Sequence, residues 1–240
     1  MHHQHITRRT AVQSLSTVAI SFILGCNHQV ANAPTSQDEI SVKPDSKDLP
    51  IPLLRRLHEI GDLIHSRFPA KFDRGMGQLG LLLSRELMNG GYWCTPINTL
   101  EFGSTGGDGV HFSLVETDGK VSENSPVVMT VPANIGEPQV ANVIVGRSLL
   151  DFVRFGLIRG YFAMEQFVYQ RDLTLQAYSS ADWQPKEKSH FSVGFAVDEA
   201  QQKTMHLVAS ELNITPLTYT PTEFELLQKQ FMPMLQFKPS

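Results

Sequence analysis

Four short stretches between residues 99 and 145 constrain the fold more than any other feature of the chain. They are rich in Val, Phe, Ile and Thr, are separated by turn-forming residues, and span residues 99–102, 110–115, 126–131 and 141–145. In the second stretch Val110, Phe112 and Leu114 alternate with other residues, which is the period of a β-strand. Because consecutive strands joined by short turns pair with their neighbours in sequence, the stretches predict an antiparallel β-meander.

Helices are predicted on both sides of this meander. Apolar residues recur at helical spacing over residues 53–66 and 77–88, and the Asn-Gly-Gly at residues 89–91 would end the second helix. Helix-capping residues predict helices that begin at Ser148 and Thr220. Two more helices are expected over residues 161–169 and 199–212, and a further strand over residues 191–197. The sequence therefore predicts one α+β domain over residues 51–240, mostly an antiparallel meander packed against flanking helices.

The N-terminus has the arrangement of an export signal. Arg8-Arg9 precedes a moderately apolar segment that ends just before Cys26. This segment is interrupted by Ser, Thr and Gln, and it is shorter than the roughly 20 apolar residues of a transmembrane helix. Residues 7–9 resemble a twin-arginine motif and residues 23–26 resemble a lipobox, which implies that residues 1–25 are removed and Cys26 is lipidated. A plain secretory peptide or a misassigned start is the alternative.

The segment that follows Cys26 has the composition of a flexible linker. Residues 27–50 are rich in Ser, Asp, Lys, Pro, Asn and Gln, and their apolar residues are isolated. We therefore expect residues 26–50 to comprise the lipidated Cys and a disordered tether. The lipid would anchor the domain to a bacterial membrane in the cell envelope. If the N-terminus is not processed, the domain would instead be cytoplasmic.

The order of motifs from residue 53 to residue 155 resembles the SUKH superfamily, which includes a yeast cell-wall-synthesis regulator domain and bacterial toxin-immunity proteins. The matching residues occur in the order of that family's pattern: Phe68-Pro69, Leu87-Met88-Asn89-Gly90-Gly91, Gly106-Gly107-Asp108-Gly109, Ser125-Pro126-Val127-Val128 and Ser148-Leu149-Leu150-Asp151-Phe152. The resemblance covers about 100 of the 240 residues. It implies an α+β domain that binds a protein partner rather than one that catalyses a reaction.

Composition excludes several other classes of protein. The formal net charge of −4 argues against a general nucleic-acid binder, because such domains carry a basic face. Two cysteines are too few for a disulfide scaffold or a Cys-rich zinc module. The chain also lacks the Gly-x-Ser-x-Gly, His-Glu-x-x-His and Cys-x-x-Cys motifs of common catalytic and metal sites. We therefore predict no cofactor and no metal.

The stretch Gly106-Gly107-Asp108-Gly109 is the main candidate for a ligand-binding loop. Asp108 and His111 could bind an ion there, but a tight hairpin turn explains the same residues, because Gly accepts positive φ and Asp caps turns. Phosphate loops are followed by a helix, whereas a strand is predicted here. Cys94 and His111 could also form a thiolate–imidazolium pair, although no third, orienting residue is evident. We favour the structural turn and an inert, buried Cys94.

These observations favour a membrane-tethered lipoprotein whose domain binds an unknown protein partner without catalysis, in an immunity-like or sequestering role. An aromatic group at residues 160–169 would serve either core packing or partner binding. The first alternative is an exported enzyme of unrecognised type that uses Asp108, His111 and Cys94. The second is a structural envelope lipoprotein.

Overall fold

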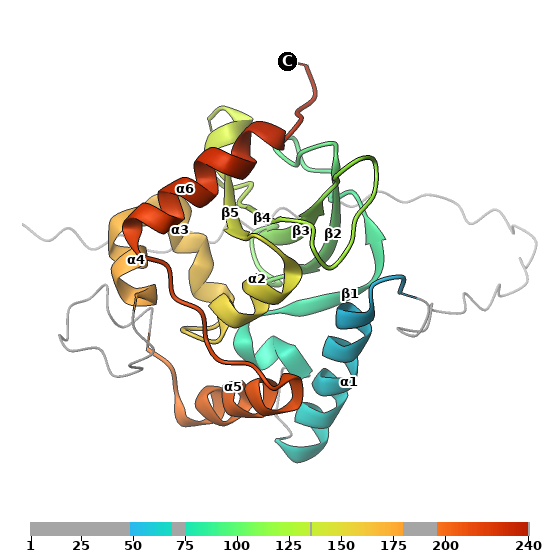
Figure 1. Ribbon diagram of the computed structural model, residues 1–240, viewed down its shortest axis with the longest axis vertical. Coiled ribbons are helices and arrows are strands. Elements are labelled where there is room, and N and C mark those ends of the chain that lie inside the picture. The colour runs from blue at the N-terminus through green and yellow to red at the C-terminus, as the bar shows by residue number, and fades with distance from the viewer. Residues whose placement is uncertain (1–48, 69–74, 135, 180–195, 240) are drawn as a thin grey trace, which may run out of the picture. The chain divides into compact units, whose positions relative to one another are not determined.

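The five strands of the sheet are neighbours both along the chain and in space. The computed structural model describes residues 49–68, 75–134, 136–179 and 196–239 (Figure 1). The strand order is β1-β2-β3-β4-β5, and each strand is antiparallel to the next. The strands are β1 (Leu82–Met88), β2 (Thr99–Ser104), β3 (His111–Val115), β4 (Val127–Thr130) and β5 (Asn142–Gly146). The predicted meander is confirmed over β2 to β5.

The first strand corrects the prediction of a helix over residues 77–88. The segment instead contains a 3-10 helix, η2 (Gly75–Leu79), followed by β1, which pairs Leu83 with Gly103 of β2. Gly80 separates the two elements at φ 78°, and a Cβ placed there would lie 2.5 Å from the Cβ of Phe162. The helical spacing of the leucines is therefore outweighed by strand pairing and by a turn that glycine permits.

Six α-helices lie within the described ranges: α1 (Pro52–Arg67), α2 (Leu149–Gly156), α3 (Gln166–Tyr169), α4 (Arg171–Tyr178), α5 (Glu199–Leu212) and α6 (Pro221–Phe231). The 3-10 helices η3 (Pro138–Ala141), η4 (Phe162–Glu165) and η6 (Met232–Met234) complete the elements used below. Side-chain caps at Ser148 and Thr220 confirm the helix starts predicted there. Helix α4 was not predicted, and the strand expected over residues 191–197 lies almost wholly outside the described residues.

Aromatic side chains form the core between the sheet and the helices that cover it. Phe152 of α2 packs against Phe102 of β2, Phe112 of β3 and Tyr161, with ring centroids 4.9 to 5.4 Å apart. A second aromatic cluster joins α2, α3, α4 and α6; it consists of Phe155, Phe167, Tyr178, Tyr219 and Phe224. The described residues thus form a single α+β domain in which α2 lies against the sheet (Figure 1).

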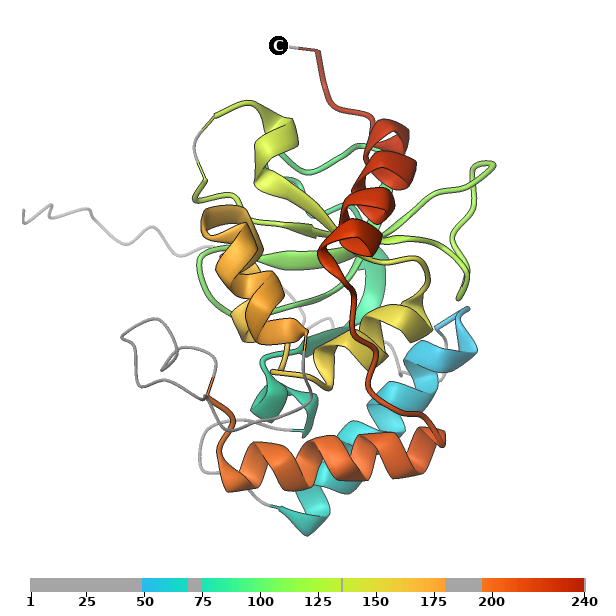
Figure 2. The same ribbon diagram turned by 60° about the vertical axis from the view of Figure 1, so that its left-hand side comes forward.

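Helices α1 and α5 pack against each other. Figure 2 shows α5 crossing α1, and an ion pair between Arg56 and Glu211 joins the two helices at 2.7 Å. α1 is amphipathic and buries Leu54, Leu57 and Ile60. None of the helices in the described ranges is long and apolar enough to cross a membrane.

Both faces of the sheet are covered at β3, and the candidate site lies on the face that the segment after β1 covers. All five residues of β3 are buried, so its alternation separates two buried faces rather than a buried face and a solvated one. Phe112 faces α2, whereas His111 faces the segment that follows β1. The segment that follows β1 also contacts the residues after η6, because the backbone N–H of Ile97 donates to the carbonyl of Gln236 at 2.8 Å.

Candidate functional site

The connection between β2 and β3 is a tight turn in the left-handed region of backbone space. Gly106, Asp108 and Gly109 have φ angles of 80°, 49° and 72°. The N–H of Thr105 donates to the carbonyl of Val110 at 3.0 Å, which closes the turn. Glycine adopts such angles without steric cost, and Asp is one of the few other residues that tolerates them. The residues at these positions therefore have a structural reason to be there.

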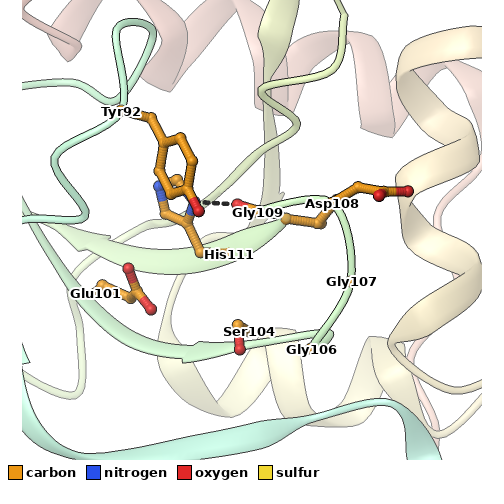
Figure 3. Close-up of a pocket in the computed structure, with 9 residues that line it drawn as sticks. Tyr92, Glu101, Ser104, Gly106, Gly107, Asp108, Gly109 and His111 are labelled. Carbon is orange, nitrogen blue, oxygen red and sulfur yellow. Dashed lines mark hydrogen bonds between the residues drawn. The ribbon is translucent and has the colours of Figure 1, made fainter. Parts of the chain in front are cut away.

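A cavity of about 250 Å³ lies beside this turn (Figure 3). Its walls come from β2, from the turn, from the start of β3 and from the segment after β1. The lining residues are Tyr92, Glu101, Ser104, Gly106, Gly107, Asp108, Gly109, Val110 and His111. Within the described residues, no three His, Cys, Asp or Glu side chains are arranged to hold a metal ion.

His111 is a buried and neutral part of the cavity wall. Its Nδ1 lies 2.7 Å from the carbonyl oxygen of Gly109, which can only accept, so Nδ1 carries the proton. Nε2 is then the acceptor for the hydroxyl of Thr95 at 3.1 Å. Burial lowers the pKa of His111, which favours this neutral form. The Tyr92 ring stacks on the imidazole with centroids 5.4 Å apart.

The structure does not bring Asp108, His111 and Cys94 together as a catalytic group. Both ring nitrogens of His111 are bonded elsewhere, and no hydrogen bond joins the ring to Cys94 in the described part of the chain. The Cys94 thiol is fully buried, and burial raises its pKa, which opposes thiolate formation. Figure 3 shows the Asp108 carboxylate pointing away from His111.

Glu101 supplies the charge that faces the cavity. It is half-buried on β2 opposite Ser113 of β3, and its carboxylate forms no hydrogen bond or ion pair with any residue that the structure describes. Burial raises the pKa of Glu101, because its carboxylate loses water without gaining a compensating donor. Gly90 approaches closely, since a Cβ there would lie 2.9 Å from Glu101 Oε2 and 2.8 Å from His111 Nε2.

Large apolar side chains are exposed around the same turn. Leu82 of β1, Tyr92, Phe162 of η4 and Tyr169 of α3 are 42, 43, 55 and 48% exposed, and we call these four residues the tip surface. The Leu82 side chain lies against the turn, since a Cβ at Gly106 would lie 2.6 Å from the Cδ1 atom of Leu82. Patches of this kind on a monomer mark binding sites more often than isolated apolar residues do.

Residues of the tip surface approach two glycines closely, and two carboxylates lie near each other beside it. Gly80, which begins the turn into β1, lies against Phe162, and Gly109 lies against the Tyr92 ring. Asp108 and Glu165 are close enough to each other to raise the pKa of Glu165, although burial is the larger cause of that rise. The tip surface is therefore apolar with carboxylates beside it.

The aromatic group expected at residues 160–169 is partly buried and partly exposed. Tyr161 and Phe167 are buried in the core, whereas Phe162 and Tyr169 are exposed. The sequence analysis singles out neither Tyr92 nor Glu101. A charged residue within a β-rich segment was the available signal for Glu101, but its position depends on how the segment after β1 folds back.

No protein family, curated protein or solved structure matches the chain. The SUKH resemblance therefore rests on the chain's own motifs. One part of that pattern is absent here, because the Asn89-Gly90 pair follows strand β1 rather than a helix.

Proposed function

We propose that the protein is a lipoprotein, tethered to a membrane of the cell envelope through Cys26, whose α+β domain binds a protein partner without catalysis. An immunity-like or sequestering role fits such a module and the SUKH resemblance. The tip surface is the observation that carries the proposal. It exposes two Tyr, one Phe and one Leu around one turn, and aromatic side chains dominate the energetics of protein interfaces.

The charges near the tip surface indicate the chemistry of the partner. Asp108 and Glu165 lie near each other beside the apolar side chains, and Glu101 lines the cavity. No Lys or Arg lines this cavity. A partner that presents apolar side chains next to a basic residue would complement both the shape and the charge of the surface.

The catalytic alternative gains no support from the site. It requires a Cys94 thiolate beside His111, but the thiol is fully buried and both imidazole nitrogens have other partners. A purely structural lipoprotein would have no reason to hold an unpaired Glu101 beside exposed aromatic rings, because both features cost solvation free energy.

The membrane tether is tested by intact-mass spectrometry of the membrane fraction from cells that express the full chain. The proposal predicts a mature protein that begins at Cys26 and carries added acyl mass. An unprocessed, soluble chain would contradict the lipoprotein assignment and favour the cytoplasmic alternative.

Protein binding is tested with paired variants of the full chain purified from its own membranes. Phe162→Ser with Tyr169→Ser removes two side chains of the tip surface. Leu150→Ser is the matched control, because Leu150 is 39% exposed at the start of α2, at the opposite end of the sheet. We expect a co-purifying protein to be lost from the double variant and kept by the control. Equal recovery with both variants would contradict the assignment of the tip surface.

A further inference from the structure

The cavity beside the tip surface contains an anionic group without a partner. The half-buried carboxylate of Glu101 has no ion pair or hydrogen bond with the described residues. Ser104, which carries a hydroxyl, lines the same cavity. Tyr92 adds an aromatic ring to the cavity wall, and the imidazole of His111 stacks on this ring. A carboxylate, a hydroxyl and an aromatic ring are the groups that contact a bound cation in proteins.

The size of the cavity limits what can occupy it. Pockets for cofactors and drug-sized ligands measure about 300–1,000 Å³, whereas this cavity measures about 250 Å³. One side chain of a partner is therefore a better fit than a whole cofactor. The cavity is partly open to the surface, and a Cβ added at Gly107, one of its lining residues, would meet no atom within 4 Å.

We infer that the cavity receives the guanidinium group of an arginine from the protein partner, with Glu101 as its acceptor and Tyr92 as the ring beside it. Arginine is favoured over lysine because its planar group offers several donors at once and stacks on aromatic rings. It can therefore bond Glu101 and Ser104 together, while a lysine ammonium would act as a point charge.

The partial burial of Glu101 supports this inference. Burial raises the pKa of Glu101, so the free protein holds a carboxylate whose lost hydration is not replaced. A guanidinium would supply charged donors in this partly desolvated place, where hydrogen bonds to charged groups are strong. The apolar side chains of the tip surface would position the partner around this contact. The inference thus rests on the proposed function and names one residue type that the partner must present.

The test is an NMR titration of the processed full chain in detergent micelles, labelled with ¹⁵N. The probe is N-acetyl-arginine methylamide, and the matched neutral probe is N-acetyl-citrulline methylamide, which has nearly the same shape. We expect the arginine probe to shift the amide signals of Tyr92, Ser104, Gly107 and Gly109. Because hydrogen bonds to charged groups contribute about 1.5–3 kcal/mol, the citrulline probe should bind at least about tenfold more weakly.

Two variants complete the test. Glu101→Gln should weaken the binding of the arginine probe by at least about tenfold, while Leu150→Ser should leave its binding unchanged. Thermal unfolding of both variants checks that they are folded. Equal binding of the two probes, unchanged binding by Glu101→Gln, or tighter binding of the corresponding lysine probe would overturn the inference.

The outcomes also separate this inference from the proposed function. If the arginine probe fails but the partner is still lost from the Phe162→Ser, Tyr169→Ser variant, only the arginine contact is wrong. If the arginine probe binds at the cavity but the tip-surface variants do not affect any partner, the contact stands and the protein-binding role of the tip surface is wrong.

Discussion

The side chain of Gln228 closes the open edge of the sheet, and this contact gives a quantitative prediction. β5 is an edge strand, and Gln228 of α6 bonds both backbone groups of Ile144. Its Oε1 accepts from the Ile144 N–H at 2.9 Å, and its Nε2 donates to the Ile144 carbonyl at 2.8 Å. Both bonds are buried, so α6 protects β5 from pairing with another chain.

Gln228→Leu removes both bonds and leaves two buried backbone groups without a partner. Each such group costs about 1–3 kcal/mol, which gives a range of about 2–6 kcal/mol for the pair. Leucine restores some apolar burial, so we expect a loss of about 2–4 kcal/mol from the free energy of unfolding. Because the total stability of a domain is about 5–15 kcal/mol, the variant should still fold but should unfold at a clearly lower urea concentration.

The assay is urea unfolding followed by far-ultraviolet circular dichroism, with the slope of the transition checked for constancy. Leu226→Ser is the control on the same helix, because Leu226 is exposed and its change should stay within about 0.5 kcal/mol. Gln228→Glu should recover stability as the pH falls, since only the protonated carboxyl can donate to the Ile144 carbonyl. A loss below about 0.5 kcal/mol for Gln228→Leu would refute the edge-closing role.

Three further predictions concern the core and the cavity. Phe152→Ala should destabilise the domain by about 3–5 kcal/mol in urea unfolding, because its ring packs against three other aromatic rings; a change below 1 kcal/mol would contradict that packing. His111 has a lowered pKa in the folded state, so the unfolded chain binds more protons near its ordinary pKa of about 6.5, and stability should fall as the pH drops below that value. His111→Gln should reduce this pH dependence, measured as the free energy of unfolding at several pH values, and an unchanged pH dependence would show that His111 is not its source. Burial raises the pKa of Glu101 in the folded state, so the domain loses stability as the pH rises through that pKa and the carboxyl ionises. Glu101→Gln should therefore raise the melting temperature at neutral pH. A lower melting temperature for this variant would indicate a structural role for the carboxylate.

The parts of the fold that sequence predicted are those fixed by local chemistry. The cap formed by Thr220 and Glu223 and the alternation around Phe112 depend on residues close in sequence, and both correspond to observed elements. β1 was mistaken for a helix because its leucines fall at helical spacing, while its pairing with β2 is decided by residues about 20 positions away. Local propensity is a weak guide where such pairing competes with it.

The candidate site, like the fold, is predicted by the sequence only in part. The turn at residues 106–109 is evident from its glycines, and the positive φ angles of Gly106 and Gly109 favour glycine there. The cavity is not evident, because Tyr92 reaches His111 only through a segment that folds over the sheet, and Glu101 reaches the same face through a register shift in β2. The exposure of Phe162 beside the buried Tyr161 likewise depends on tertiary packing.

The claim that the tip surface binds a protein is tested most directly by site-specific photo-cross-linking at residue 162 in cells that make the full chain. A photoreactive phenylalanine replaces Phe162, and the same group at residue 150 is the control. The account predicts one discrete product at residue 162, absent at residue 150, whose partner peptide contains apolar residues and an arginine. Equal products at both positions, no product at residue 162, or a product that contains only a second copy of this chain would contradict it.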